Sequence, residues 1–223
     1  MKLFRTQKLT RISIGFFVIF YLVWTVAELV IHPAMNQVIP DGSILSQLLF
    51  DGIIKNLCWT VPALMLINQY DDDLYLKKPD LFRNPVSLKQ ILPIFGYEAA
   101  FCVLNSVISH RGFYFRPDGL KECVGFLFVG ITEELVFRGF LLNAAVRDDN
   151  QYQAAALNAV LFLSIHFPIW ILYGNFVNYF TNFGFVTILM LSAFFSWAFL
   201  KFKNIWVPVG LHMLWDILVT ILN

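Results

Sequence analysis

Apolar residues gather in seven long segments of the chain, separated by short stretches that hold most of the charged residues. The segments cover residues 12–31, 44–68, 90–109, 121–146, 153–173, 183–200 and 205–222. A transmembrane helix needs about 20 mostly apolar residues. The pattern therefore predicts an all-α, polytopic membrane protein with seven transmembrane helices. The stretch 174–182 predicts a loop or a short interfacial helix, so eight transmembrane helices are the alternative.

Two charged residues interrupt the second segment, Asp51 and Lys55. They are four residues apart, a spacing that places an acid and a base on one face of a helix. We expect them to form an ion pair with each other. A position lining a polar cavity is the alternative.

The composition agrees with a membrane protein, since 58% of the residues are hydrophobic and 14% are charged. Soluble domains usually carry about 25% charged residues. No long soluble stretch is present, so residues 1–223 are predicted to form a single integral membrane domain in contact with membrane lipid. No basic stripe interleaved with aromatic residues lies outside the apolar segments, which argues against nucleic-acid binding.

The distribution of lysine and arginine predicts the orientation of the chain in the membrane. With the N-terminus in the cytoplasm, cytoplasmic ends and loops hold Lys2, Arg5, Lys8, Arg11, Lys77, Lys78, Arg83, Lys89, Arg147, Lys201 and Lys203. The opposite side holds Arg111, Arg116 and Lys121. Because cytoplasmic loops carry an excess of positive residues, this bias predicts a cytoplasmic N-terminus.

The fourth segment carries two adjacent carboxylates and an arginine, Glu133, Glu134 and Arg138. An ionised side chain near the bilayer centre costs at least about 2.5–3.5 kcal/mol, so each needs a partner, a wet cavity or a function. Glu134 and Arg138 are i and i+4 on a helix and are predicted to pair, holding the helix and balancing its charge. Glu133 lies about 100° round the helix from Glu134, so it is left free for chemistry.

Later segments contribute His166, and His212 with Asp216 one helical turn further on. With a rise of 1.5 Å per residue, Glu133 and His166 lie about 20 Å from the cytoplasmic ends of their segments, Asp216 about 18 Å and His212 about 12 Å. Three separate helices thus place ionisable side chains at similar levels in the bilayer. We expect these side chains to meet in one pocket.

Carboxylates and imidazoles in such a pocket suit the activation of a water molecule. Glu133 is the candidate general base, and His166 would hold the same water or ligate a metal ion that does. His212 and Asp216 would orient each other and stabilise an oxyanion. Each group alone also has a structural explanation, such as a hydrogen bond between helices. Their number exceeds what packing requires and favours catalysis.

At these residues the sequence resembles the CPBP family of intramembrane proteases, which includes the CAAX prenyl endopeptidases and the Abi, or bacteriocin self-immunity, proteins. The first motif of the family, E-E-x-x-x-R, is present as EELVFRG at 133–139. The second, F-x-x-x-H, is FLSIH at 162–166, and the third, H-x-x-x-N or D, is HMLWD at 212–216. The three motifs occur in order, each within an apolar segment, and the resemblance covers residues 120–220.

The resemblance implies a hydrolase that cleaves a peptide bond in a membrane-associated or lipidated peptide or protein. The resemblance also implies that Glu133 activates the attacking water, with His166 beside it. It further implies that His212 and Asp216 lie where the oxyanion of the substrate forms. The prenyl endopeptidases more usually carry Asn where this chain has Asp216, and a carboxyl donates a hydrogen bond only when protonated. Asp216 would then fix the tautomer of His212 or ligate a metal.

The resemblance leaves metal assistance open. Glu133, His166 and His212 would satisfy a catalytic zinc, whereas the HExxH helix of many zinc proteases is absent.

Two functions of other classes also stay open. A bacteriocin-immunity protein would sequester a membrane-active peptide and keep the motifs as scaffold. A proton-coupled transporter uses the same residue types, although the inverted repeats typical of transporters are not visible. Short loops and the absence of organelle signals favour the plasma membrane of a prokaryote.

Overall fold

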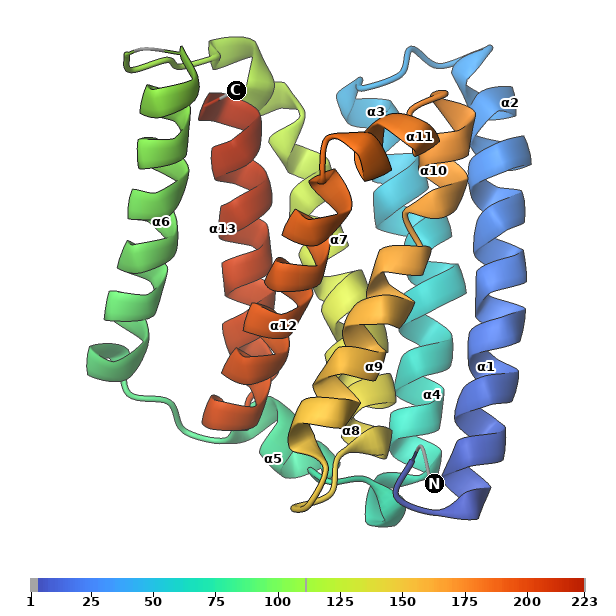
Figure 1. The fold of residues 1–223 in the computed structure, drawn as a ribbon. Helices are drawn as coiled ribbons and strands as arrows, with labels where there is room; N and C mark the ends of the chain where they lie inside the picture. Colours follow the sequence, from blue (N-terminus) through green and yellow to red (C-terminus); the bar gives the residue numbers. More distant parts are fainter. Residues whose placement is uncertain (1–3, 111, 223) are drawn as a thin grey trace.

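The computed structural model describes residues 4–110 and 112–222, and these residues form helices and connecting loops without a β-strand. Long helices run side by side in a bundle, with the N-terminus at one end and the C-terminus at the other (Figure 1). The predicted all-α fold is confirmed. The organisation of residues 1–223 as a single domain stays a prediction.

The first two long helices, Gln7–Asn36 and Ile44–Gln69, each change geometry part of the way along. The first consists of α1 (Gln7–Val26), the π-helix η1 (Ala27–Ile31) and α2 (His32–Asn36). The second consists of α3 (Ile44–Leu49), the π-helix η2 (Phe50–Thr60) and α4 (Val61–Gln69). A proline follows each π-helix, Pro33 and Pro62. Because a proline ring clashes with the carbonyl four residues earlier, a widened turn there relieves the clash.

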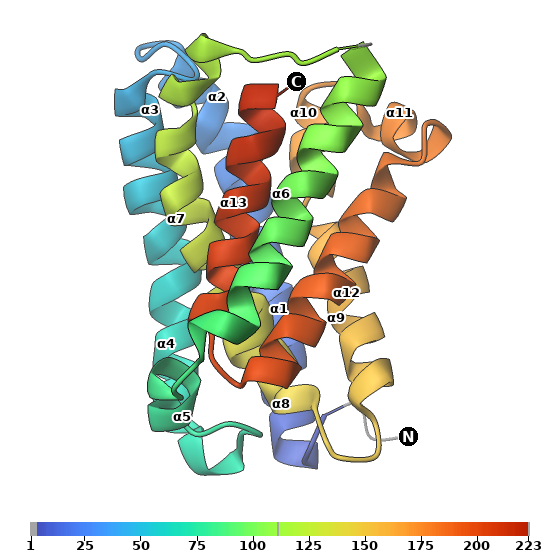
Figure 2. The ribbon, with the colours of Figure 1, turned by 90° about the vertical axis from the view of Figure 1, so that its left-hand side faces the viewer.

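The third long helix, α6 (Leu88–His110), stands at the edge of the bundle in Figure 1 and packs on α13, in front of which it lies in Figure 2. The connection to it carries the short helices η3 (Asp71–Asp73) and α5 (Lys78–Arg83). This connection is anchored on Asn143, whose side-chain amide donates to the carbonyl of Leu76 and accepts from its N–H. The connection therefore packs against the N-terminal end of the bundle.

The fourth helical stretch lies at the centre of the bundle. It begins after the short helix η4 (Pro117–Lys121) and consists of α7 (Cys123–Glu134), the π-helix η5 (Leu135–Leu142) and α8 (Asn143–Ala145). Every residue from 132 to 146 is buried. A helix that is apolar and buried on all sides belongs to the interior of a large helical assembly. The two glutamates and the arginine of the first motif are therefore interior residues.

The C-terminal part surrounds this central stretch with α9 (Gln151–Ser164), α10 (Phe167–Leu172), α12 (Gly184–Phe202) and α13 (Trp206–Leu222). Helix α9 packs on α12, and α13 packs on both α6 and α7. The six-residue helix α11 (Phe176–Thr181) lies within the predicted 174–182 stretch. At 1.5 Å per residue it is too short to cross a bilayer, so it adds no eighth transmembrane helix.

Five helices among the described residues are long and apolar enough to cross a membrane: Gln7–Asn36, Ile44–Gln69, Leu88–His110, Gln151–Leu172 and Gly184–Phe202. The other two predicted segments also form helices. Trp206–Leu222 is apolar but shorter, and the central stretch 123–145 carries three charged residues. The polytopic membrane fold is confirmed, and the number of seven crossings stays a prediction.

The loops 70–87, 146–150 and 203–205 lie at the same end of the bundle as the N-terminus (Figure 1). These loops hold several of the cations predicted to be cytoplasmic. Lys2 and Arg111, used in the same argument, lie outside the described residues. The arrangement agrees with the charge bias, and the cytoplasmic location of this end stays a prediction.

Candidate active site

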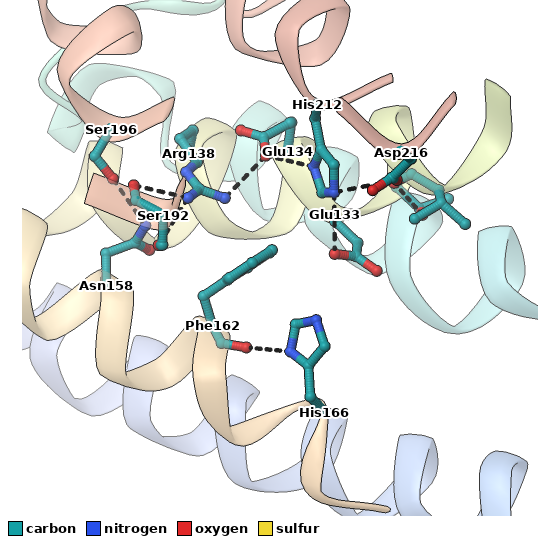
Figure 3. Close-up of polar contacts among 12 residues, drawn as sticks. Glu133, Glu134, Arg138, Asn158, Phe162, His166, Ser192, Ser196, His212 and Asp216 are labelled. Atoms are coloured by element: carbon teal, nitrogen blue, oxygen red, sulfur yellow. Dashed lines mark hydrogen bonds and ion pairs between the residues drawn. The ribbon is translucent and has the colours of Figure 1, made fainter. Parts of the chain in front are cut away.

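The residues singled out in the sequence lie together in the interior of the bundle (Figure 3). Glu133 and Glu134 come from the end of α7, His212 from α13, and His166 from the junction of α9 and α10. Helix α13 approaches α7 closely at Gly130, where an added Cβ would lie 2.7 Å from Cγ of Met213 and 3.2 Å from the carbonyl oxygen of Val209. Small residues permit such close contacts between membrane helices.

Glu134 connects the arginine of the first motif to the histidine of the third. Its Oε1 accepts a hydrogen bond of 2.9 Å from Nη1 of Arg138 and another of 2.9 Å from Nδ1 of His212. Glu134 and Arg138 both have a relative exposure of 0%. The ion pair predicted from their spacing is present, and Glu134 in addition orients His212.

Arg138 is held on its other side by α12. Its Nη2 donates to the carbonyl oxygen of Ser192 at 2.9 Å and to the hydroxyl of Ser192 at 2.7 Å. Its guanidinium lies over the rings of Phe162 and Phe195, at 4.7 and 5.5 Å. A buried charge needs this many partners because removal from water is costly. Arg138 thus links α7, α9 and α12 through one side chain.

His212 presents its second ring nitrogen to two further carboxylates. Nε2 lies 3.5 Å from Oδ2 of Asp216 and 3.8 Å from Oε2 of Glu133. Both distances exceed a normal hydrogen bond, so Nε2 has two carboxylates nearby but no short hydrogen bond to either. The ring stacks on Phe195 at 5.0 Å, which fixes its plane. Glu134 accepts the hydrogen bond from Nδ1 of His212 and thereby fixes the proton on that nitrogen. From the sequence, Asp216 was the candidate for this role.

His166 lies where α9 gives way to α10, and Pro168 follows two residues later. The predicted segment 153–173 is therefore not one regular helix. Nδ1 of His166 lies 3.0 Å from the carbonyl oxygen of Phe162. A carbonyl only accepts, so Nδ1 carries the proton and Nε2 is left for another partner. The imidazole points toward the carboxylate of Glu133 (Figure 3), near enough for the two groups to interact electrostatically.

The expected ion pair between Asp51 and Lys55 is wrong. Lys55 instead donates a hydrogen bond of 2.7 Å from Nζ to Oε1 of Glu133, and no ion pair with Asp51 is present in the described part of the chain. The reason is the packing of η2 on α7, which brings a carboxylate of another helix closer than the one in the same helix. Glu133 is therefore not the partnerless carboxylate that the spacing suggested.

Two polar residues of this region were not singled out in the sequence, and a third, Lys55, was given the wrong partner. Ser192 binds Arg138, Lys55 binds Glu133, and Glu98 of α6 is buried with neither carboxylate oxygen hydrogen-bonded to another described residue. Glu98 is near enough to His212 and Asp216 to interact electrostatically. A charged residue within an apolar segment was the available signal for Glu98 and Lys55. Ser192 carries no such signal.

A catalytic zinc needs three protein ligands that converge on one point. Among residues 4–110 and 112–222, no group of three His, Cys, Asp or Glu side chains is placed to hold a metal ion. Oε1 of Glu133 is in addition taken up by Lys55. The described residues in this arrangement do not fit a metal.

The chain is thus a polytopic helical membrane protein with a buried site of carboxylates and imidazoles carried by separate helices. Residues 123–218 match the model of a family described as type II CAAX prenyl endopeptidase Rce1-like. The match contains all three motifs and confirms, for this part of the chain, the resemblance to the CPBP and CAAX protease family. No curated protein and no solved structure matches the chain.

Proposed function

We propose that the protein is an intramembrane endopeptidase that hydrolyses a peptide bond of a membrane-associated or lipidated substrate. The family match supports a CAAX-type protease at the level of the family. The observation that carries the proposal is the position of Glu133, whose carboxylate lies between the imidazole of His166 and Nε2 of His212. A carboxylate can accept a proton from a water molecule, and an adjacent imidazole can hold that water in place.

In the proposed reaction a water molecule lies between Glu133 and His166 and donates hydrogen bonds to Oε2 of the one and Nε2 of the other. As the water oxygen bonds to the carbonyl carbon of the substrate, its proton passes to Glu133. The carbonyl becomes an oxyanion, which His212 stabilises as an imidazolium, with Nδ1–H donating to Glu134 and Nε2–H donating to the oxyanion. When the C–N bond breaks, Glu133 returns the proton to the leaving nitrogen. The products are a carboxylic acid and an amine.

The apolar part of the substrate has a cavity available beside this site. A cavity of about 250 Å³ lies between α6, α12 and α13. Its lining residues are Tyr97, Glu98, Phe101, Thr187, Met190, Leu191, Phe194 and Trp215. Tyr97 and Met190 are 68% and 67% exposed on the side of the bundle, where a membrane would supply lipid. Trp215 precedes Asp216, so a lipid chain held here lies beside the third motif.

The test is cleavage of a fluorogenic farnesylated CAAX peptide by purified protein in liposomes. We expect Glu133→Gln to lower the rate by at least about 10²-fold, the lower end of what a general base contributes. The control is Glu122→Gln, which removes an exposed carboxylate at the start of α7 that pairs with Arg116. Equal cleavage by Glu133→Gln and the wild type would remove Glu133 from the mechanism.

The same variants separate the two other functions. Cells carrying Glu133→Gln or His166→Ala and challenged with a membrane-active bacteriocin lose protection if hydrolysis provides it. Undiminished protection favours sequestration instead. Substrate flux into proteoliposomes without cleavage products favours transport. Zinc assistance is tested in the peptide assay with a chelator, and the arrangement of Glu133 with Lys55 predicts an unchanged rate.

A further inference from the structure

Lys55 is a buried cation that neither the three motifs nor the family match includes. It lies in the middle of the π-helix η2, outside residues 123–218, and its relative exposure is 4%. Two indole rings enclose its ammonium group, with Trp24 at 5.2 Å and Trp59 at 4.6 Å. Cation–π contacts of this kind compensate part of the cost of removing the charge from water.

On the side that the two indole rings leave open, the ammonium group of Lys55 faces Glu133, the base of the proposed reaction. Nζ donates to Oε1 of Glu133 at 2.7 Å, and the two side chains are 5% and 8% exposed. A charge-assisted hydrogen bond of this length is about twice as strong as a neutral one. It fixes the rotation of the carboxylate, so Oε2 is the oxygen that remains for water and for His212.

One of the two tryptophans around Lys55, Trp24, also contacts the second motif. Nε1 of Trp24 donates a hydrogen bond of 3.0 Å to the carbonyl oxygen of Ile165, the residue before His166. Trp24 contacts Trp59 edge to face, with ring centroids 4.7 Å apart. One group of side chains from the first two long helices thus positions both Glu133 and the backbone that carries His166.

We infer that Lys55 is a positioning residue for the hydrolytic reaction, which supplies the counter-charge of Glu133 and directs Oε2 toward the attacking water. Lys55 touches Glu133 and acts through it. The inference rests on the proposed function, because the orientation of Oε2 affects the reaction only if Glu133 accepts a proton from the attacking water.

The kinetic test uses Lys55→Met, a substitution of similar length without charge, and Lys55→Arg, which keeps the charge in a different geometry. In the farnesylated peptide assay we expect Lys55→Met to lower kcat by about 10²-fold while KM changes by less than about threefold. We expect kcat of Lys55→Arg to be at least about tenfold higher than that of Lys55→Met, since the counter-charge returns. A wild-type kcat in Lys55→Met, or a loss confined to KM, overturns the inference.

The matched control is Lys201→Met. Lys201 also lies over a tryptophan, Trp197, at 4.7 Å, but it is exposed at the end of α12 and has no carboxylate partner among the described residues. This variant keeps the wild-type kcat. An equal loss of kcat in it would show that removing any such lysine impairs the enzyme, and would overturn the assignment.

A second test does not depend on proteolysis. Thermal unfolding is measured for Lys55→Met, Glu133→Gln and the variant carrying both. Removing one partner leaves a lone buried charge, whereas removing both leaves none, so the double variant unfolds at a higher temperature than Lys55→Met alone. If the decreases in melting temperature of the two single variants add up in the double variant, the contact between Lys55 and Glu133 is overturned. If the wild type cleaves no peptide, the proposed function fails while this measurement still decides the pairing.

Discussion

At the scale of single residues, Glu133 and Glu134 are neighbours in the chain with different partners. Glu134 is fully buried and hydrogen-bonds to Arg138 and to His212. Glu133 has one oxygen on Lys55 and the other 3.8 Å from His212. Adjacent positions on a helix point about 100° apart, so Glu134 faces Arg138 and His212, whereas Glu133 faces Lys55 and is the base of the proposed reaction.

A substitution of Glu134 tests this division. We expect Glu134→Gln to lower the free energy of unfolding by about 3–5 kcal/mol, the usual cost of leaving one partner of a buried ion pair uncompensated. The measurement is reversible unfolding in mixed detergent micelles. Asp72→Asn is the control, because its ion pair with Lys77 at 2.7 Å is exposed and contributes little. Equal small losses in both variants would contradict an essential role for the buried pair.

At the scale of helices, the approach of α13 to α7 decides whether His212 reaches the glutamates. Gly130 lies one turn before Glu133, and Met213 follows His212. A side chain at position 130 would press on Met213 and on the backbone of Val209. The distances of 2.9 and 3.8 Å from His212 to the two glutamates depend on this contact.

We therefore expect Gly130→Val to push the two helices apart and to lower kcat by at least about tenfold, because catalytic groups lose their alignment. The measurement is the peptide assay with the melting temperature recorded in parallel. Gly15→Val on α1 is the control, since an added Cβ there meets nothing within 4 Å. A wild-type kcat in Gly130→Val would show that the close contact is dispensable.

At the scale of the whole molecule, the candidate catalytic groups lie between two apolar clusters. Phe162 belongs to the larger cluster around the central helix, and Phe195 to the smaller one shared by α12 and α13. The lateral cavity opens beside the smaller cluster, where α6 leaves room next to Trp215. In the proposed function, the lipid chain of the substrate enters this cavity from the side of the bundle.

Filling the cavity tests whether substrate uses it. We expect Leu191→Trp to raise KM for the farnesylated peptide by at least about fivefold with a smaller change in kcat, because the pocket contributes binding away from the reacting bond. Leu104→Trp is the control, since Leu104 lies on α6 outside the cavity lining and is 58% exposed. An unchanged KM in Leu191→Trp would place the lipid chain elsewhere.

The sequence predicted the helices and the convergence of Glu133, His166 and His212 because a charge in an apolar segment is costly and therefore conspicuous. It gave the wrong partner for Lys55, since spacing reveals neighbours within a helix and Glu133 is 78 residues away. Ser192 and Gly130 were missed for a related reason. A serine or a glycine is ordinary in a membrane helix, and its importance depends on which helix packs against it.

The most direct measurement of the central claim is hydrolysis of the farnesylated peptide in H₂¹⁸O, with mass spectrometry of the products. If Glu133 activates water for direct attack, the wild type places one ¹⁸O in the new carboxyl group, and Glu133→Gln forms labelled product at least about 10²-fold more slowly. Absence of cleavage by the wild type, or equal labelled product from Glu133→Gln, would contradict the account.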